Sequence, residues 1–125
     1  MDLNSYLTPH FRLWELIVPE KTILPEIDDI IISNLTIVCE KLEDIRSHFN
    51  KPITVNSGYR TFEHNKQVGG ELHSYHRLGK AADIVVLGIP AKDVQEYLKN
   101  WKGGLGLYKG FTHIDIRPYK ARWRG

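Results

Sequence analysis

The chain has 125 residues and a mass of 14.5 kDa, with 42% hydrophobic and 26% charged residues. This size and mixture are those of one globular domain, so a large multidomain protein is excluded. No segment approaches the roughly 20 uninterrupted apolar residues that a membrane-spanning helix needs, and the first residues lack the basic start and apolar run of a secretory signal. We therefore expect a soluble, monomeric, single domain over residues 1–125 that is synthesised in the cytoplasm.

The cysteine count and the charge distribution further restrict the classes of protein to which the chain can belong. A single cysteine, Cys39, excludes an internal disulfide and a cysteine-rich structural zinc site, so the core must stabilise the fold and a metal would serve chemistry. The net charge is only +2, but residues 109–125 are rich in basic side chains. This tail is either a solvated C-terminus or a contact for an acidic polymer, such as cell-wall material or nucleic acid. Its basic residues are Lys109, Arg117, Lys120, Arg122 and Arg124.

The hydrophobic pattern predicts a long first helix over residues 26–49. Apolar residues recur there at spacings of three and four, as they do on one face of an α-helix. Cys39 lies beside this apolar stripe and is expected in or near the core. The stripe consists of Ile27, Ile31, Leu35, Val38, Leu42, Ile45 and Phe49.

Shorter elements follow. Residues 53–56 predict a strand that runs into a turn at 57–60, and residues 61–68 predict a short helix that Gly69-Gly70 ends. After a loop, residues 81–87 predict a mostly buried strand, and Pro90 begins another helix. Residues 105–108 and 111–117 predict a hairpin, with His113, Asp115 and Arg117 on one face of its second strand. This order indicates an α+β domain with a small, mainly antiparallel sheet and flanking helices.

The segment SYHRLGKAAD, residues 74–83, indicates a metal site. His76 lies on a glycine-containing loop, and Asp83 lies in the apolar strand, where an unpaired carboxylate would cost several kcal/mol. Zinc is a suitable partner because it binds imidazole nitrogen and carboxylate oxygen and uses three protein ligands in catalytic sites. His113 is the best third ligand, since it lies in the middle of a strand with apolar residues on the opposite face. The histidines expected on polar surfaces are His10, His48 and His64.

The run ITVNSGYRTFEHNKQVGGELHSYHRLGKAADI, followed by GLGLYKGFTHIDIR, resembles a family of zinc peptidases. This is the peptidase M15 family, which includes the D-Ala-D-Ala carboxypeptidases and related murein peptidases, and the similarity is to its compact C-terminal catalytic branch. The opening YLTPHFRLWELI and the long helix extend the resemblance to nearly the whole chain. It implies a fold shared with the hedgehog signalling domain, and action on bacterial cell walls by a carboxypeptidase, an endopeptidase or a phage-type lysin.

The resemblance also implies zinc ligands. The family pattern S-x-H-x-x-G-x-A-x-D matches Ser74, His76, Gly79, Ala81 and Asp83, and the late strand histidine of the family matches His113. His76, Asp83 and His113 would then bind Zn²⁺.

The family turn S-G-Y-R matches residues 57–60 and implies a substrate contact. Arg60 would face the site, where its planar fork of donors can hold a terminal carboxylate or a peptide carbonyl. We expect Tyr59 and Ser74 to contact substrate beside it.

The general base does not follow from the family pattern. Better-known members carry an acidic residue shortly before the last histidine, where this chain has residues 109–112, KGFT. Asp115 is nearest in sequence, and it either accepts a proton from water as the base or orients the imidazole of His113. His73 is a further candidate for the base.

Three functional hypotheses follow. The main one is a zinc peptidase that hydrolyses an amide bond in peptidoglycan peptides and has no specific nucleic-acid partner. The alternative is a non-catalytic zinc-binding interaction or structural module of the same fold, which the missing upstream acid supports. A basic polymer-binding protein without metal would rest on the tail alone and would leave Asp83 unexplained.

Overall fold

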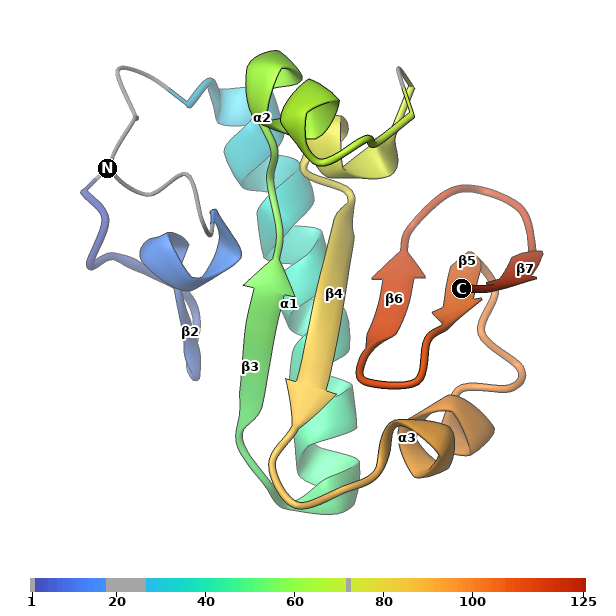
Figure 1. Ribbon diagram of the computed structural model, residues 1–125. Coiled ribbons are helices and arrows are strands. Elements are labelled where there is room, and N and C mark those ends of the chain that lie inside the picture. The colour runs from blue at the N-terminus through green and yellow to red at the C-terminus, as the bar shows by residue number, and fades with distance from the viewer. Residues whose placement is uncertain (1, 18–26, 72) are drawn as a thin grey trace.

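The structure is a computed structural model that describes residues 2–17, 27–71 and 73–125 (Figure 1). The elements are β1 Tyr6–Thr8, β2 Phe11–Arg12, the 3₁₀ helix η1 Leu13–Leu16, α1 Asp29–Phe49, β3 Ile53–Ser57, α2 Phe62–Gln67, the 3₁₀ helix η2 Tyr75–Leu78, β4 Ala81–Val86, α3 Ala91–Tyr97, β5 Gly104–Leu107, β6 Thr112–Asp115 and β7 Ala121–Arg124. Helix α1 packs on one face of a five-stranded sheet of order β3-β4-β6-β5-β7 and runs along β3 and β4 in Figure 1. Its strand pairs are antiparallel except for β5 with β7. The predicted α+β fold with a mainly antiparallel sheet is confirmed.

Helix α1 buries its apolar stripe in the core. Asp28 caps the helix by accepting a hydrogen bond of 2.9 Å from the backbone N–H of Ile31, and Asn50 ends it in the left-handed conformation with φ of 53°. Cys39 is fully buried as predicted, and burial raises the pKa of its thiol. The other buried residues of the helix are Leu35, Val38, Leu42 and Ile45, which confirms the centre of the predicted stripe.

The central strands divide their side chains between the two faces of the sheet, as the alternation of a strand requires. Ile84, Leu105 and Ile114 join the hydrophobic core with α1. On the other face, Asp83 pairs with His113, His113 with Gly106, and Gly106 with Trp123 across four neighbouring strands. A register shift in β3 extends this row by placing Ser57 opposite Asp83. Residues distant in sequence therefore share one row across the sheet.

The end of the basic tail is not a free C-terminus, because residues Ala121–Arg124 form strand β7 along the edge of β5. Arg122 holds the strand through its guanidinium: Nη1 donates to the carbonyl oxygens of Gly103 and Ala121, each at 2.8 Å, and Nη2 donates to those of Trp101 and Lys99. The tail is thus part of the sheet. The N-terminal elements β1, β2 and η1 were also not predicted.

None of the described helices is long and apolar enough to cross a membrane.

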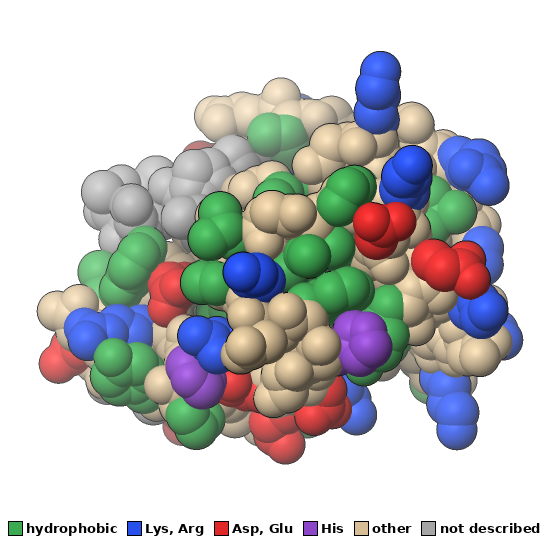
Figure 2. Space-filling view, turned by 90° about the horizontal axis from the view of Figure 1, so that it is seen from below, with side chains coloured by type: hydrophobic (Ala, Val, Ile, Leu, Met, Phe, Trp, Pro, Cys, Tyr) green, Lys and Arg blue, Asp and Glu red, His purple; other side chains and the backbone are tan. Residues whose placement is uncertain are grey.

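An exposed apolar side chain lies where β4 ends and the chain leads toward α3. Leu87, which follows β4, is 63% exposed. Figure 2 shows this end of the molecule, with hydrophobic side chains near the middle of the face and Lys and Arg side chains along one side. Asp83 is the third residue of β4 and lies nearer the other end of this strand.

Candidate metal centre

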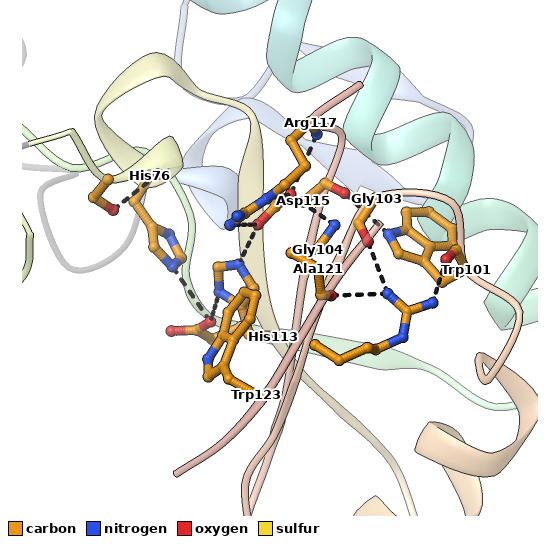
Figure 3. Close-up of polar contacts among 12 residues, drawn as sticks. His76, Trp101, Gly103, Gly104, His113, Asp115, Arg117, Ala121 and Trp123 are labelled. Carbon is orange, nitrogen blue, oxygen red and sulfur yellow. Dashed lines mark hydrogen bonds and ion pairs between the residues drawn. The ribbon is translucent and has the colours of Figure 1, made fainter. Parts of the chain in front are cut away.

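Two histidines and one aspartate converge on the face of the sheet away from α1. His76 comes from η2, Asp83 from β4 and His113 from β6, and one ligand atom of each lies within 4.8 Å of the others. Figure 3 shows the side chains of His76 and His113 close to each other. The three residues are buried, with exposed fractions of 3%, 8% and 8%. The fold therefore brings together the three residues that the sequence suggested as metal ligands.

The backbone holds the ring of His76. Nδ1 lies 2.8 Å from the carbonyl oxygen of Gly58, which can only accept, so Nδ1 carries the proton. The lone pair of Nε2 is then available, and this atom lies 3.3 Å from Oδ1 of Asp83. Helix η1 supports the turn, because a Cβ on Gly58 would lie 2.0 Å from the carbonyl oxygen of Leu16. Glycine at this position lets the turn approach η1 and present its carbonyl to His76.

His113 lies between two carboxylates. Its Nε2 is 2.8 Å from Oδ2 of Asp115, and its Nδ1 is 2.9 Å from Oδ1 of Asp83. Burial alone would lower the pKa of His113, but hydrogen bonds with the two carboxylates raise it. Burial likewise opposes ionisation of Asp83, yet hydrogen bonds with His113 and His76 hold the pKa of that carboxyl well below its usual range. Two imidazole nitrogens and an ionised carboxylate thus face one point, a donor set that suits zinc.

Asp115 is fully buried and has its acceptor sites filled. Oδ2 accepts from Nε2 of His113 and, at 2.7 Å, from Nη2 of Arg117. Oδ1 accepts from the backbone N–H of Gly104 at 2.9 Å and from Nε and the backbone N–H of Arg117 at 2.8 and 3.2 Å. Burial opposes ionisation, but these hydrogen bonds hold the pKa of Asp115 well below its usual range. Of the two predicted roles, this arrangement favours orienting His113, since a carboxylate offers about four lone pairs.

Two glycines of strand β5 leave space for larger side chains on the face of the sheet that carries the candidate ligands. A Cβ on Gly104 would meet Oδ2 of Asp115 at 2.2 Å, and a Cβ on Gly106 would meet Nε1 of Trp123 at 2.7 Å. Leu105 packs into the core from the opposite face. The alternation of glycine and leucine in GLGL therefore leaves room for the Asp115 carboxylate and the Trp123 indole while the strand still contributes to the core.

Arg60 lies at the site and is held by three neighbours. Its Nε donates to Oγ of Ser57 at 3.0 Å, its Nη1 donates to Oδ1 of Asn65 at 3.3 Å, and its Nη2 lies 3.5 Å from Oδ2 of Asp83. Burial lowers the pKa of Arg60, and the charge of Asp83 opposes this effect. Asn65, which is only 2% exposed, also donates to the carbonyl oxygen of Glu71 at 2.6 Å. Arg60 can therefore hold Oδ2 of Asp83 in place, and its position beside the site also allows contact with a substrate.

A cleft of about 770 Å³ opens over the three candidate ligands, and its lining includes the predicted residues Arg60, His73 and Ser74. His73 is exposed on the rim. Oγ of Ser74 accepts a hydrogen bond of 3.2 Å from the backbone N–H of His76, so it also caps η2. Tyr59 packs against the hydrophobic core, and its backbone N–H donates to the carbonyl oxygen of Leu16 at 2.7 Å.

Several cleft residues were not assigned from the sequence. Arg117 had been placed on the face of His113 by strand alternation, but its two-pronged contact with Asp115 had not been foreseen. Trp123 alternates with two arginines in the tail, a pattern that could have identified it as the inward side chain of a strand. The unassigned lining residues with large side chains are Glu71, Tyr75, Tyr108, Arg117, Tyr119 and Trp123.

Two of the other histidines make contacts of a different kind. Nδ1 of His10 lies 2.7 Å from Oε1 of Glu43, and the ring of His48 stacks on Tyr97 with centroids 3.7 Å apart. His64 belongs to α2, and its side chain lies outside the described part of the chain.

Known proteins resemble parts of this chain. It is 36% identical over 86 residues to the probable peptidoglycan L,D-endopeptidase MepK of Haemophilus influenzae, covering 61% of this chain and 45% of that protein. It is 33% identical over 76 residues to the peptidoglycan L,D-endopeptidase MepK of Escherichia coli K12, covering 54% and 42%. It is 42% identical over 53 residues to the zinc D-Ala-D-Ala carboxypeptidase of Streptomyces albus G, covering 42% and 21%.

These matches cover less than half of each of these curated relatives. The model of the peptidase M15 family, in contrast, matches residues 9–115, which include the three candidate ligands and most of the chain. The protein belongs to the peptidase M15 family.

Proposed function

We propose that this protein is a zinc-dependent peptidase that hydrolyses an amide bond in peptidoglycan peptides and acts on the cell wall. The observation that carries the proposal is the convergence of His76, Asp83 and His113 at the base of a cleft, with both imidazoles oriented by hydrogen bonds. Relatives named as peptidoglycan L,D-endopeptidases and as a zinc D-Ala-D-Ala carboxypeptidase support the substrate class and the metal.

The residues present fit zinc. Nε2 of His76, a carboxylate oxygen of Asp83 and Nδ1 of His113 would hold it, which leaves the cleft side for water and substrate. When bound, zinc polarises the scissile carbonyl and lowers the pKa of a water molecule. The Gly58 carbonyl and the Asp115 carboxylate keep the two imidazoles in the required tautomers.

Hydrolysis needs a general base, which must be a side chain that lies in the cleft and can still accept a proton. Asp115 is fully buried and surrounded by donors, whereas Glu71 and His73 are exposed side chains in the cleft lining. We propose that one of these two accepts the proton of the attacking water and returns it to the leaving amine. Arg60 binds a carbonyl or a carboxylate of the peptide and so fixes the position of the scissile bond.

A non-catalytic zinc-binding module of the same fold is the second candidate. Two observations favour it: the donors that surround Asp115, and the absence of an acidic residue among residues 109–112. This candidate predicts stoichiometric zinc binding without hydrolysis.

The test uses zinc-loaded protein and soluble peptidoglycan peptides of defined sequence, with mass spectrometry of the products. Release of a terminal D-alanine identifies a carboxypeptidase, and an internal cut identifies an endopeptidase. His113→Ala is the inactive control. Glu71→Gln and His73→Gln locate the base, because its loss should lower turnover by about 10² to 10⁴-fold. Intact peptides in the presence of bound zinc would contradict the proposal in favour of the second candidate.

A further inference from the structure

Tyr108 places an aromatic ring beside the metal centre. It directly follows β5 and lines the cleft. Its ring lies over Gly106, since a Cβ on that glycine would meet Cε2 of Tyr108 at 2.8 Å. Gly106 is the cross-strand partner of His113. The ring therefore occupies the space that the missing side chain of Gly106 leaves next to a candidate zinc ligand.

Several contacts fix the orientation of this ring. Tyr108 stacks on Phe111 with centroids 4.4 Å apart and an interplanar angle of 11°. Gly125 lies against its other edge, where a Cβ would meet Cε1 at 1.9 Å. Nε2 of Gln95 donates to the backbone carbonyl oxygen of Tyr108 at 2.9 Å and so anchors the loop between β5 and β6 from α3. The side chain is thus held in one place before any substrate binds.

The hydroxyl of Tyr108 has a defined polarity. Nε1 of Trp123 lies 3.0 Å from it, and an indole N–H can only donate, so the phenol oxygen is the acceptor in this bond. The proton of the hydroxyl must then point elsewhere, and none of the described residues accepts a hydrogen bond from it. The Trp123 ring itself lies 5.0 Å from the His113 ring, centroid to centroid, and both Tyr108 and Trp123 line the cleft.

We propose that the Tyr108 O–H donates a hydrogen bond to the carbonyl oxygen of the scissile amide as negative charge develops on that oxygen. This inference rests on the proposed peptidase function. The proton stays on Tyr108 throughout, and no bond to the residue is made or broken. Trp123 is a positioning residue, because its N–H turns the hydroxyl proton toward the cleft. Trp123 lies outside residues 9–115, the part of the chain that the family model matches.

The test is the Tyr108→Phe variant, which keeps the ring and removes the hydroxyl. We expect kcat on soluble peptidoglycan peptides to fall by about 10² to 10³-fold, the effect of removing one preorganised donor. The Michaelis constant, zinc content and melting temperature should stay near those of the wild type. Tyr97→Phe, which removes a hydroxyl outside the cleft, is the matched control and should keep wild-type turnover.

A double-mutant cycle separates this role from a structural one. Trp123→Phe should lower kcat by itself but should cause no further loss in Tyr108→Phe, because it acts only through the hydroxyl. Full additivity of the two losses would contradict the positioning role. Tyr108→Phe could fail to fold because the indole N–H of Trp123 lacks its acceptor. The double variant Tyr108→Phe/Trp123→Phe removes that donor as well, and comparing its kcat with that of Trp123→Phe then measures the effect of the hydroxyl.

The outcomes also separate this inference from the proposed function. Hydrolysis by the wild type at a rate that Tyr108→Phe fully retains would overturn the role of Tyr108 alone. A zinc-loaded wild type that cleaves no peptide would overturn the proposed function, and the role of Tyr108 with it.

Discussion

His113 and Asp115 lie two residues apart on the same face of β6 and are joined by a hydrogen bond of 2.8 Å between Nε2 and Oδ2. The bond leaves Nδ1 of His113 directed at Asp83. Arg117 and the backbone N–H of Gly104 hold the Asp115 carboxylate in turn. One candidate ligand of the metal centre is thus oriented by its own strand and by the strand beside it.

The first prediction concerns Asp115→Asn. If Asp115 orients His113, zinc affinity should fall by about 10 to 100-fold, and turnover should largely return at saturating zinc. Competition with a chromophoric chelator measures the affinity, and kcat at saturating zinc measures the turnover. Asp44→Asn, an exposed position on α1, is the control. A loss of about 10² to 10⁴-fold in kcat that persists at saturating zinc would instead identify Asp115 as the base.

The second prediction concerns Arg60→Lys. Lysine keeps the charge but loses the planar fork, so it cannot contact Ser57, Asn65 and Asp83 together. We expect kcat/KM to fall by about 10 to 100-fold, as for the loss of a hydrogen bond to a charged group, with zinc still bound. Arg46→Lys in the last turn of α1 is the matched control. Wild-type kinetics for Arg60→Lys would remove Arg60 from substrate binding.

The third prediction concerns the basic tail. Arg122→Ala removes donors to four backbone carbonyls and should lower the free energy of unfolding by about 1 to 2 kcal/mol. The exposed residue Lys120 should tolerate alanine within about 0.5 kcal/mol. Urea unfolding measures both. Equal stability of the two variants, with equally weakened and salt-dependent binding to whole cell walls, would contradict this structural role and support the expectation that the tail is a polymer contact.

The fourth prediction concerns removal of the metal. The core between α1 and the sheet contains none of the three candidate ligands, so the chain should stay folded when a chelator removes zinc. The buried thiol of Cys39, whose pKa burial raises, reports this directly. It should remain unreactive toward a disulfide reagent at neutral pH with or without chelator. Rapid labelling of Cys39 after chelation would show that zinc holds the fold together.

The helix α1, strand β4 and the β5–β6 hairpin could be predicted because their patterns are local. The stripe of α1 repeats at helical spacing over many residues, and the alternation in β6 placed His113, Asp115 and Arg117 on one face. The candidate ligands could be named because a carboxylate in the apolar strand β4 needs a partner, and because the motif around His76 resembles a zinc peptidase.

The remainder depends on contacts that no local pattern contains. Strand β7 carries two arginines in four residues and has the composition of a solvated end, but the edge of β5 and the contacts of Arg122 determine its place. The position of Asp115 depends on Gly104 in the neighbouring strand, whose backbone N–H it accepts. The elements β1, β2 and η1 span two to four residues each, too few for periodicity to appear.

The most direct test of the account measures zinc content and peptide hydrolysis together. Purified protein is analysed for zinc and incubated with purified peptidoglycan, and newly released amines are counted before chelation, after chelation and after zinc is restored. We predict one zinc per chain, hydrolysis that chelation abolishes and zinc restores, and neither property in His113→Ala. Undiminished hydrolysis by the metal-free protein, or stoichiometric zinc in a variant that lacks the side chains of His76, Asp83 and His113, would contradict the account.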